Sequence, residues 1–200
     1  MYRFYLAAVD MLPGALILMP VFLLLNRVYF HDWRKSICYF MFSCYLSVVY
    51  VLVGMPNVIY MRPELNLNLI PIIGMIEDFK NSILNILLFI PLGTMMPILW
   101  NKFRSQRNTL LFGLGVSLAI ELLQMLTFRA TDVNDLITNT LGTYLGFLCA
   151  QILLNRSVKL RQMVNEKNTR ELGFLLAIVF MVMFLVYPFV SSALWDFVLQ

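Results

Sequence analysis

The chain has 200 residues, of which 60% are apolar or aromatic and 13% are charged, and its formal net charge is +4. A soluble domain is about half apolar and about a quarter charged, so this composition excludes an ordinary soluble globular protein. The basic residues do not form a compact patch interleaved with aromatic residues, which argues against a nucleic-acid partner. By length and composition we expect one membrane domain spanning residues 1–200.

Long apolar stretches follow one another along the whole chain. A hydrocarbon core of about 30 Å needs roughly 20 helical residues. The sequence therefore predicts an all-α integral membrane protein with about six transmembrane helices, lying within residues 11–26, 36–61, 81–101, 108–128, 136–155 and 172–195. The fourth stretch is interrupted only by Glu121.

The connection between the second and third predicted helices, residues 56–80, is also apolar in part. Its apolar portion is too short to cross a bilayer, which favours a re-entrant or interfacial segment. Such a segment is tolerated at membrane depth only where protein or water covers its backbone. We expect it to form a wall or lid beside the polar residues described below.

Lysine and arginine are concentrated in the loops after the first, third and fifth predicted helices, which hold eleven of the fifteen basic residues. Loops rich in lysine and arginine stay in the cytoplasm. This rule predicts a multi-pass protein with both termini outside the cell.

Polar side chains gather where the third, fourth and fifth predicted helices meet the outer face. Glu121 and Gln124 are three residues apart and share one helix face. Ionisable groups within apolar spans cost roughly 2.5–3.5 kcal/mol, and for this reason they usually mark functional sites. We therefore predict an outward-facing polar pocket formed by Asn85, Glu121, Gln124, Arg129, Asp132, Asp135 and Asn139.

Some residues in this region have a simpler structural interpretation. Gly142 and Gly146 form a small-xxx-small pattern that lets helices approach closely. Pro91 and Gly93 indicate a kink in the third helix. Asp132 is placed to cap the fifth helix, and an acidic residue in the first turn suits the helix dipole. For the two aspartates, capping and a role in the pocket both remain open.

The same residues bear on metal and cofactor binding. No spacing of cysteine and histidine is typical of zinc. Carboxylate oxygens could hold a hard cation, but the predicted pocket includes Arg129 and shows no ligand spacing that selects a metal. We expect no metal and no cofactor.

Several of these residues occur in an ordered set of motifs. They are Asn68-Leu-Ile-Pro71, Asn85 followed by Pro91-Leu-Gly93, Glu121-x-x-Gln124, Arg129-x-x-Asp132-x-x-Asp135 and Asn139-x-x-Gly142-x-x-x-Gly146. Over residues 65–155 this set resembles the VanZ-like membrane protein family, named for a protein that gives bacteria low-level resistance to the glycopeptide teicoplanin. The resemblance implies a bacterial cell-membrane setting and supporting roles for Asn68, Pro71, Pro91, Gly93, Gly142 and Gly146.

Three functional hypotheses follow. The favoured one is a binding protein that contributes to glycopeptide resistance, without established catalysis. Its partners would be membrane lipids and a lipid-linked cell-wall precursor or the glycopeptide itself. The second is an enzyme that modifies a lipid-linked substrate, with one carboxylate as general acid and another as base. The third is a transporter or flippase, which the confinement of polar groups to one side makes the weakest. The oligomeric state is not indicated.

Overall fold

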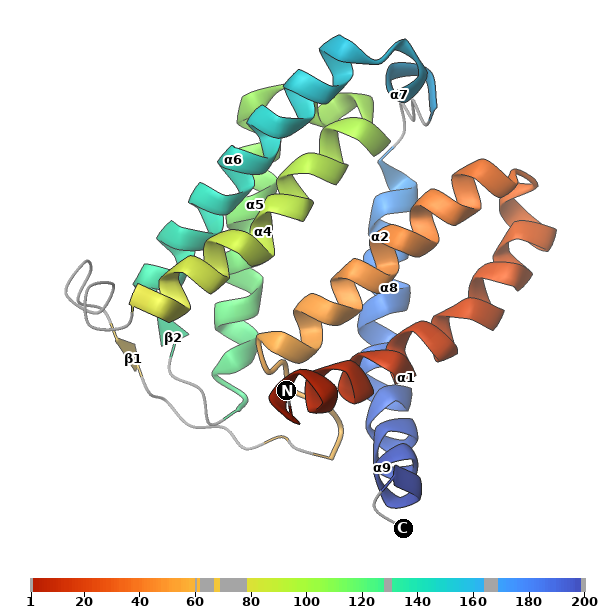
Figure 1. The fold of residues 1–200 in the computed structure, drawn as a ribbon, viewed down its shortest axis with the longest axis vertical. Helices are drawn as coiled ribbons and strands as arrows, with labels where there is room; N and C mark the ends of the chain where they lie inside the picture. The colour runs from red at the N-terminus through yellow and green to blue at the C-terminus, as the bar shows by residue number, and fades with distance from the viewer. Residues whose placement is uncertain are drawn as a thin grey trace. The chain divides into compact units, whose positions relative to one another are not determined.

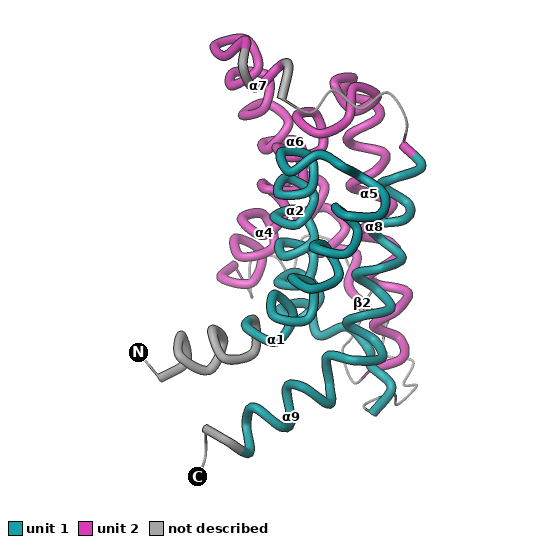
Figure 2. Tube along the Cα trace, turned by 90° about the vertical axis from the view of Figure 1, so that its right-hand side faces the viewer, with its two compact units in different colours: residues 1–61, 170–200 teal, residues 62–169 magenta. Residues whose placement is uncertain are grey.

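A computed structural model describes residues 2–59, 61, 67–68, 79–127, 131–163 and 169–198. These residues are almost all helical, apart from two strands of two residues each. They form two compact units, the first from residues 1–61 and 170–200 and the second from residues 62–169 (Figure 2). The all-α membrane class predicted from the sequence is confirmed.

The first unit combines the two ends of the chain. Its helical segments are α1 (Tyr2–Leu25), the π-helical η1 (Asn26–Phe30), α2 (Trp33–Leu52), α8 (Arg170–Met181), the π-helical η3 (Val182–Val186) and α9 (Tyr187–Val198). The turn between η1 and α2 places His31 in the left-handed region, with a φ of 50°. Asp32 then caps α2, because its carboxylate accepts the backbone N–H groups of Arg34 and Lys35.

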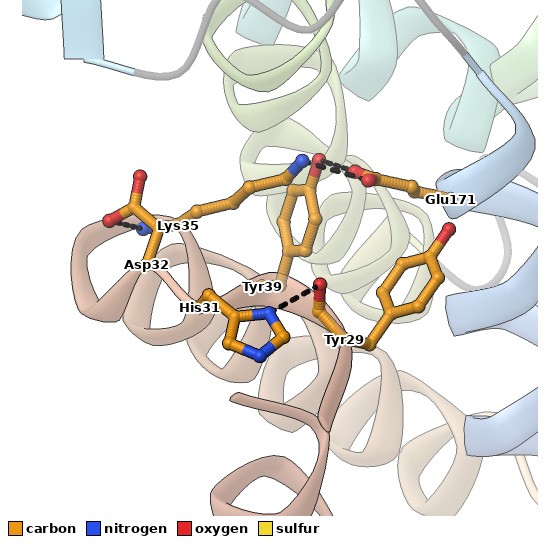
Figure 3. A network of polar contacts seen from close by, with 6 residues as sticks. All are labelled: Tyr29, His31, Asp32, Lys35, Tyr39 and Glu171. Atoms are coloured by element: carbon orange, nitrogen blue, oxygen red, sulfur yellow. Dashed lines mark hydrogen bonds and ion pairs between the residues drawn. The ribbon is translucent and has the colours of Figure 1, made fainter. Parts of the chain in front are cut away.

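A polar network joins α2 to α8 within this unit (Figure 3). The Lys35 ammonium lies 2.8 Å from Glu171 Oε1, and the Tyr39 hydroxyl donates to Glu171 Oε2 over 2.6 Å. The Lys35 and Glu171 side chains are only 17% and 14% exposed. A pair shielded in this way keeps more of its electrostatic attraction than an exposed pair. The network therefore fixes the start of α8 against α2.

The second unit is built on three long helices that run side by side (Figure 1). Its elements are β1 (Leu67–Asn68), α4 (Phe79–Leu99), the 3-10 helix η2 (Asn101–Arg104), α5 (Gln106–Gln124), β2 (Thr131–Asp132), α6 (Val133–Arg156) and α7 (Val158–Met163). The two strands pair in parallel, with Leu67 opposite Thr131 and Asn68 opposite Asp132.

Close backbone contact holds α4 against α6. A Cβ atom added to Gly142 would overlap the Ile86 carbonyl oxygen, and one added to Gly146 would overlap that of Ile90. In the other direction, a Cβ atom on Gly93 would meet the Thr143 carbonyl oxygen. Small residues at a membrane helix interface allow this approach and the van der Waals contact that follows from it. The packing role predicted for Gly142 and Gly146 is confirmed.

Five segments of the described chain are long and apolar enough to cross a membrane: Leu12–Phe30, Trp33–Leu52, Phe79–Leu99, Val133–Arg156 and Arg170–Asp196. The fourth predicted span is present as the 19-residue helix α5, but α5 is not among these five because polar residues lower its hydropathy. The count of six spans stays a prediction. Most of the expected re-entrant segment lies outside the described residues. Of its central part, the structure describes only β1.

Candidate polar site

The site lies in the second unit, where α5 ends and α6 begins (Figure 1). Glu121 is in the last turn of α5 and is 1% exposed. Its Oε2 atom accepts the backbone N–H of Asp132 over 2.9 Å. A buried carboxylate needs such donors, because burial removes the hydrogen bonds that it makes to water. This bond ties the end of α5 to β2.

Asp132, whose N–H donates to Glu121, is itself the N-cap of α6. Its Oδ1 atom accepts both the backbone N–H and the side-chain amide of Asn134, each over 2.8 Å. Asp135 follows in the first turn of α6. Unpaired N–H groups and the helix dipole make this end of a helix favourable for negative charge. The capping interpretation of Asp132 and the first-turn position of Asp135 are both confirmed.

Asp135 also connects α6 to α4. The Asn85 side-chain amide donates to Asp135 Oδ1 over 2.8 Å. Asn85 and Asp135 are both half-buried. Asn85 and Asp135, two predicted pocket residues that are 50 positions apart in the sequence, are therefore in direct contact.

One turn further into α6, Asn139 faces α5. Its side-chain amide donates to the Ser117 hydroxyl over 2.9 Å, and both residues are buried. The Asn139 Oδ1 atom is buried and accepts no hydrogen bond from the described residues. The Thr143 hydroxyl lies 2.9 Å from the Asn139 backbone carbonyl oxygen and continues the polar contacts along α6.

The remaining predicted residues fall in different places. Gln124 is buried at the end of α5, where its backbone carbonyl accepts the Thr127 hydroxyl over 2.8 Å. The backbone of Asn68 lies opposite Asp132 in the strand pair. Pro91 lies inside α4, and the kink proposed there stays a prediction. Arg129 and Pro71 lie outside the described residues.

Three hydrogen-bonded groups lie in this region, and we call their residues together the polar cluster: Asn85 with Asp135, Ser117 with Asn139, and Glu121 with Asp132 and Asn134. It contains three carboxylates, at the end of α5 and the start of α6. In the described part of the chain, no group of three or more histidine, cysteine, aspartate or glutamate side chains is arranged to hold a metal ion. Ionised carboxylates accept hydrogen bonds from donors such as N–H and O–H groups.

Comparison with known proteins places this arrangement in a family. The family model described as VanZ/LLP1 matches residues 37–154, which is more than half of the chain. The chain belongs to the VanZ/LLP1 family. It is 31% identical over 123 residues to Protein VanZ from Enterococcus faecium, an alignment that covers 61% of this chain and 71% of that protein. No solved structure matches.

The VanZ/LLP1 match has a wider extent than the motifs alone suggest. It begins inside α2 and ends near the end of α6, so it includes every residue of the polar cluster. Membership of the family and the apolar helices together identify a multi-pass membrane protein.

Sequence reasoning missed four members of this buried polar region: Ser117, Asn134, Thr138 and Thr143. Each is at most 3% exposed. A signal was present on α5, where Thr109, Gly113, Ser117 and Glu121 recur at every fourth residue. Residues four apart lie on one helix face, and a small or polar face on an otherwise apolar helix indicates packing against another helix. The structure places α6 against that face, since a Cβ atom on Gly113 would come 2.5 Å from Thr143 Oγ1.

Proposed function

We propose that this VanZ/LLP1 protein contributes to resistance against teicoplanin-type glycopeptides by binding a polar ligand at the outer leaflet of the bacterial membrane. The ligand is a lipid-linked cell-wall precursor or the glycopeptide itself, and the polar cluster provides its hydrogen-bonding groups. Catalysis is not part of the proposal.

The observation that carries the proposal is the position of the three carboxylates. Glu121 lies near the end of α5, and Asp132 and Asp135 lie at the start of α6, and each carboxylate is oriented by a backbone or amide donor. Cell-wall precursors and glycopeptides present many hydroxyl and amide donors, and hydrogen bonds to an ionised acceptor are about twice as strong as neutral ones. A pre-oriented set of carboxylates suits such ligands.

The distribution of basic residues supports an outward orientation of the cluster. Lys102 and Arg107 flank the start of α5, whereas Glu121 lies near its other end. If the basic end is cytoplasmic, as the positive-inside rule requires, the polar cluster lies toward the outer face. A ligand arriving from outside would then reach it without crossing the bilayer.

The test compares teicoplanin susceptibility of bacteria that express the wild-type protein, Glu121→Gln or Asp135→Asn, at matched protein levels. Each variant keeps an oxygen that can accept the hydrogen bond seen here, but loses the charge. We expect both to lower the resistance to that of cells without the protein. Asp196→Asn, at an exposed aspartate outside the matched region, is the control and should behave as wild type. Wild-type resistance in both cluster variants would refute the proposal.

Mass spectrometry of envelope lipids separates binding from catalysis. Binding predicts the same lipids and wall precursors with and without the protein. A new species that depends on Glu121 would replace the binding proposal with the enzymatic hypothesis, in which carboxylates act as general acid and base.

A further inference from the structure

Basic side chains gather at the other end of the second unit from the polar cluster. The short helix η2 and the start of α5 provide some of them, and the end of α6 and α7 provide the rest. Residues 101–108 and 151–163 contain no aspartate or glutamate. We call Lys102, Arg104, Arg107, Arg156 and Arg161 the basic cluster.

The fold brings these two segments together. The Arg104 guanidinium donates through Nη2 to the Arg161 backbone carbonyl over 2.9 Å, and the Gln151 side-chain amide donates to the Arg104 carbonyl over 3.3 Å. The helix α7 also packs against α4. Figure 1 shows α7 beyond the end of α6 that is remote from β2. Two basic segments about 50 positions apart in sequence thus meet at Arg104.

The charges of this surface are not neutralised within the described residues. Lys102, Arg107, Arg156 and Arg161 are exposed. None of the five basic residues forms an ion pair with another described residue, in contrast to Lys35 in the first unit. Arg104 is half-buried, and its buried Nε has no acceptor among the described residues. The exposed guanidinium groups of Arg107, Arg156 and Arg161 have the planar geometry that suits phosphate oxygens.

Apolar side chains border the basic cluster. Leu111 in α5, Ile152 and Leu153 near the end of α6, and Val158 at the start of α7 are each at least 41% exposed. A ligand that meets both surfaces must carry negative charge at one end and hydrocarbon at the other. This combination favours a phospholipid over free phosphate.

We propose that the basic cluster binds the headgroup of an anionic phospholipid, with the acyl chains lying on the adjoining apolar residues. Basic residues beside the end of a membrane helix attract anionic lipids, and basic surfaces between such helices accommodate headgroups with two phosphates. Five cations on two segments match a lipid of the cardiolipin type, in which two phosphates are joined by glycerol. This site is independent of the polar cluster and of the proposed resistance function.

The test titrates the full-length protein in detergent with cardiolipin and, separately, with zwitterionic phosphatidylethanolamine, and counts bound lipid by native mass spectrometry. We compare the wild type with the double variants Lys102→Gln/Arg107→Gln and Arg156→Gln/Arg161→Gln. The control is Arg27→Gln/Arg34→Gln, which removes the same charge from two exposed arginines of the first unit. Thermal unfolding confirms that each variant is folded.

We expect selective binding of cardiolipin by the wild type and the control. Each cluster variant should bind about 25-fold more weakly, since each charge near the membrane surface contributes about fivefold. Equal weakening by the control would show an effect of net charge and overturn the site. Equal binding of cardiolipin and phosphatidylethanolamine would also overturn the site. Displacement of the lipid by millimolar inorganic phosphate would overturn the assignment to a phospholipid.

Discussion

At the scale of single residues, Glu121 combines a structural contact with an ionisable group. Its burial and its bond to the Asp132 N–H give it a role in holding α5 to β2. This contact is local to the site and can be separated experimentally from the charge, because glutamine offers an equivalent acceptor oxygen.

We predict that Glu121→Ala destabilises the protein more than Glu121→Gln. Alanine leaves the half-buried Asp132 N–H without its acceptor, which costs about 2 kcal/mol. A loss of this size corresponds to a fall of about 5 °C in the midpoint of thermal unfolding. Thermal unfolding in detergent measures this shift of the midpoint. Asp196→Asn, which removes an exposed carboxylate elsewhere in the chain, is the control. Similar midpoints for alanine and wild type would show that the bond to Asp132 contributes nothing to stability.

The residue scale also shows where sequence reasoning was sufficient. Capping by Asp132 was one of the two interpretations that the sequence left open, and the structure shows it. Capping depends on neighbours within three residues, so a sequence can indicate it. The hydrogen bond between Asn139 and Ser117 was not predicted from the sequence. Their contact depends on how α5 and α6 are rotated about their axes, which spacing within one helix does not determine.

At the scale of elements, the interface between α4 and α6 is set by glycine. The backbones approach so closely at Gly93, Gly142 and Gly146 that a single added methyl group would overlap a carbonyl oxygen of the other helix. In interiors packed this closely, even one added methyl group affects stability.

We predict that Gly146→Ala destabilises the protein by about 1–3 kcal/mol, the usual range for overpacking. The matched control is Gly115→Ala in α5, where an added Cβ atom would meet no other atom within 4 Å. Because alanine favours helix over glycine by about 1 kcal/mol, the control should be neutral or slightly stabilising. Thermal unfolding in detergent distinguishes the two. Equal midpoints would contradict the close packing of α4 and α6.

The ends of the elements differ from the boundaries predicted from charge. Helix α2 begins at Trp33, directly after its cap Asp32, rather than at the end of the charged stretch. Helix α1 begins at Tyr2 and passes through Arg3 and Asp10, which mark no helix end. Charge indicates where a chain leaves the hydrocarbon, whereas capping and backbone hydrogen bonds decide where a helix stops.

At the scale of the whole molecule, the orientation in the membrane is the prediction with the widest consequences. Lys80 and Lys102 are both exposed and lie at opposite ends of α4 and its extension η2. The positive-inside rule places Lys80 outside the cell and Lys102 inside.

We predict that a membrane-impermeant maleimide labels Lys80→Cys in intact cells and labels Lys102→Cys only after permeabilisation. The background is a variant in which Cys38, Cys44 and Cys149, which are free thiols, are replaced by serine. Permeabilised cells provide the control that both positions are reactive. The reverse pattern would place the polar cluster toward the cytoplasm and contradict the proposed outer-leaflet function.

The sequence by itself determined the membrane class and the approximate positions of the helices, and it indicated Asp132 as a candidate cap of α6. These features depend on the length and polarity of continuous segments, because a bilayer and a helix end each select residues within a short stretch of chain. The division into two units, the glycine contacts between α4 and α6, and the pairs Asn85–Asp135 and Asn139–Ser117 appeared only in the tertiary structure. They depend on the mutual rotation and depth of helices distant in sequence, and packing of their side chains decides both.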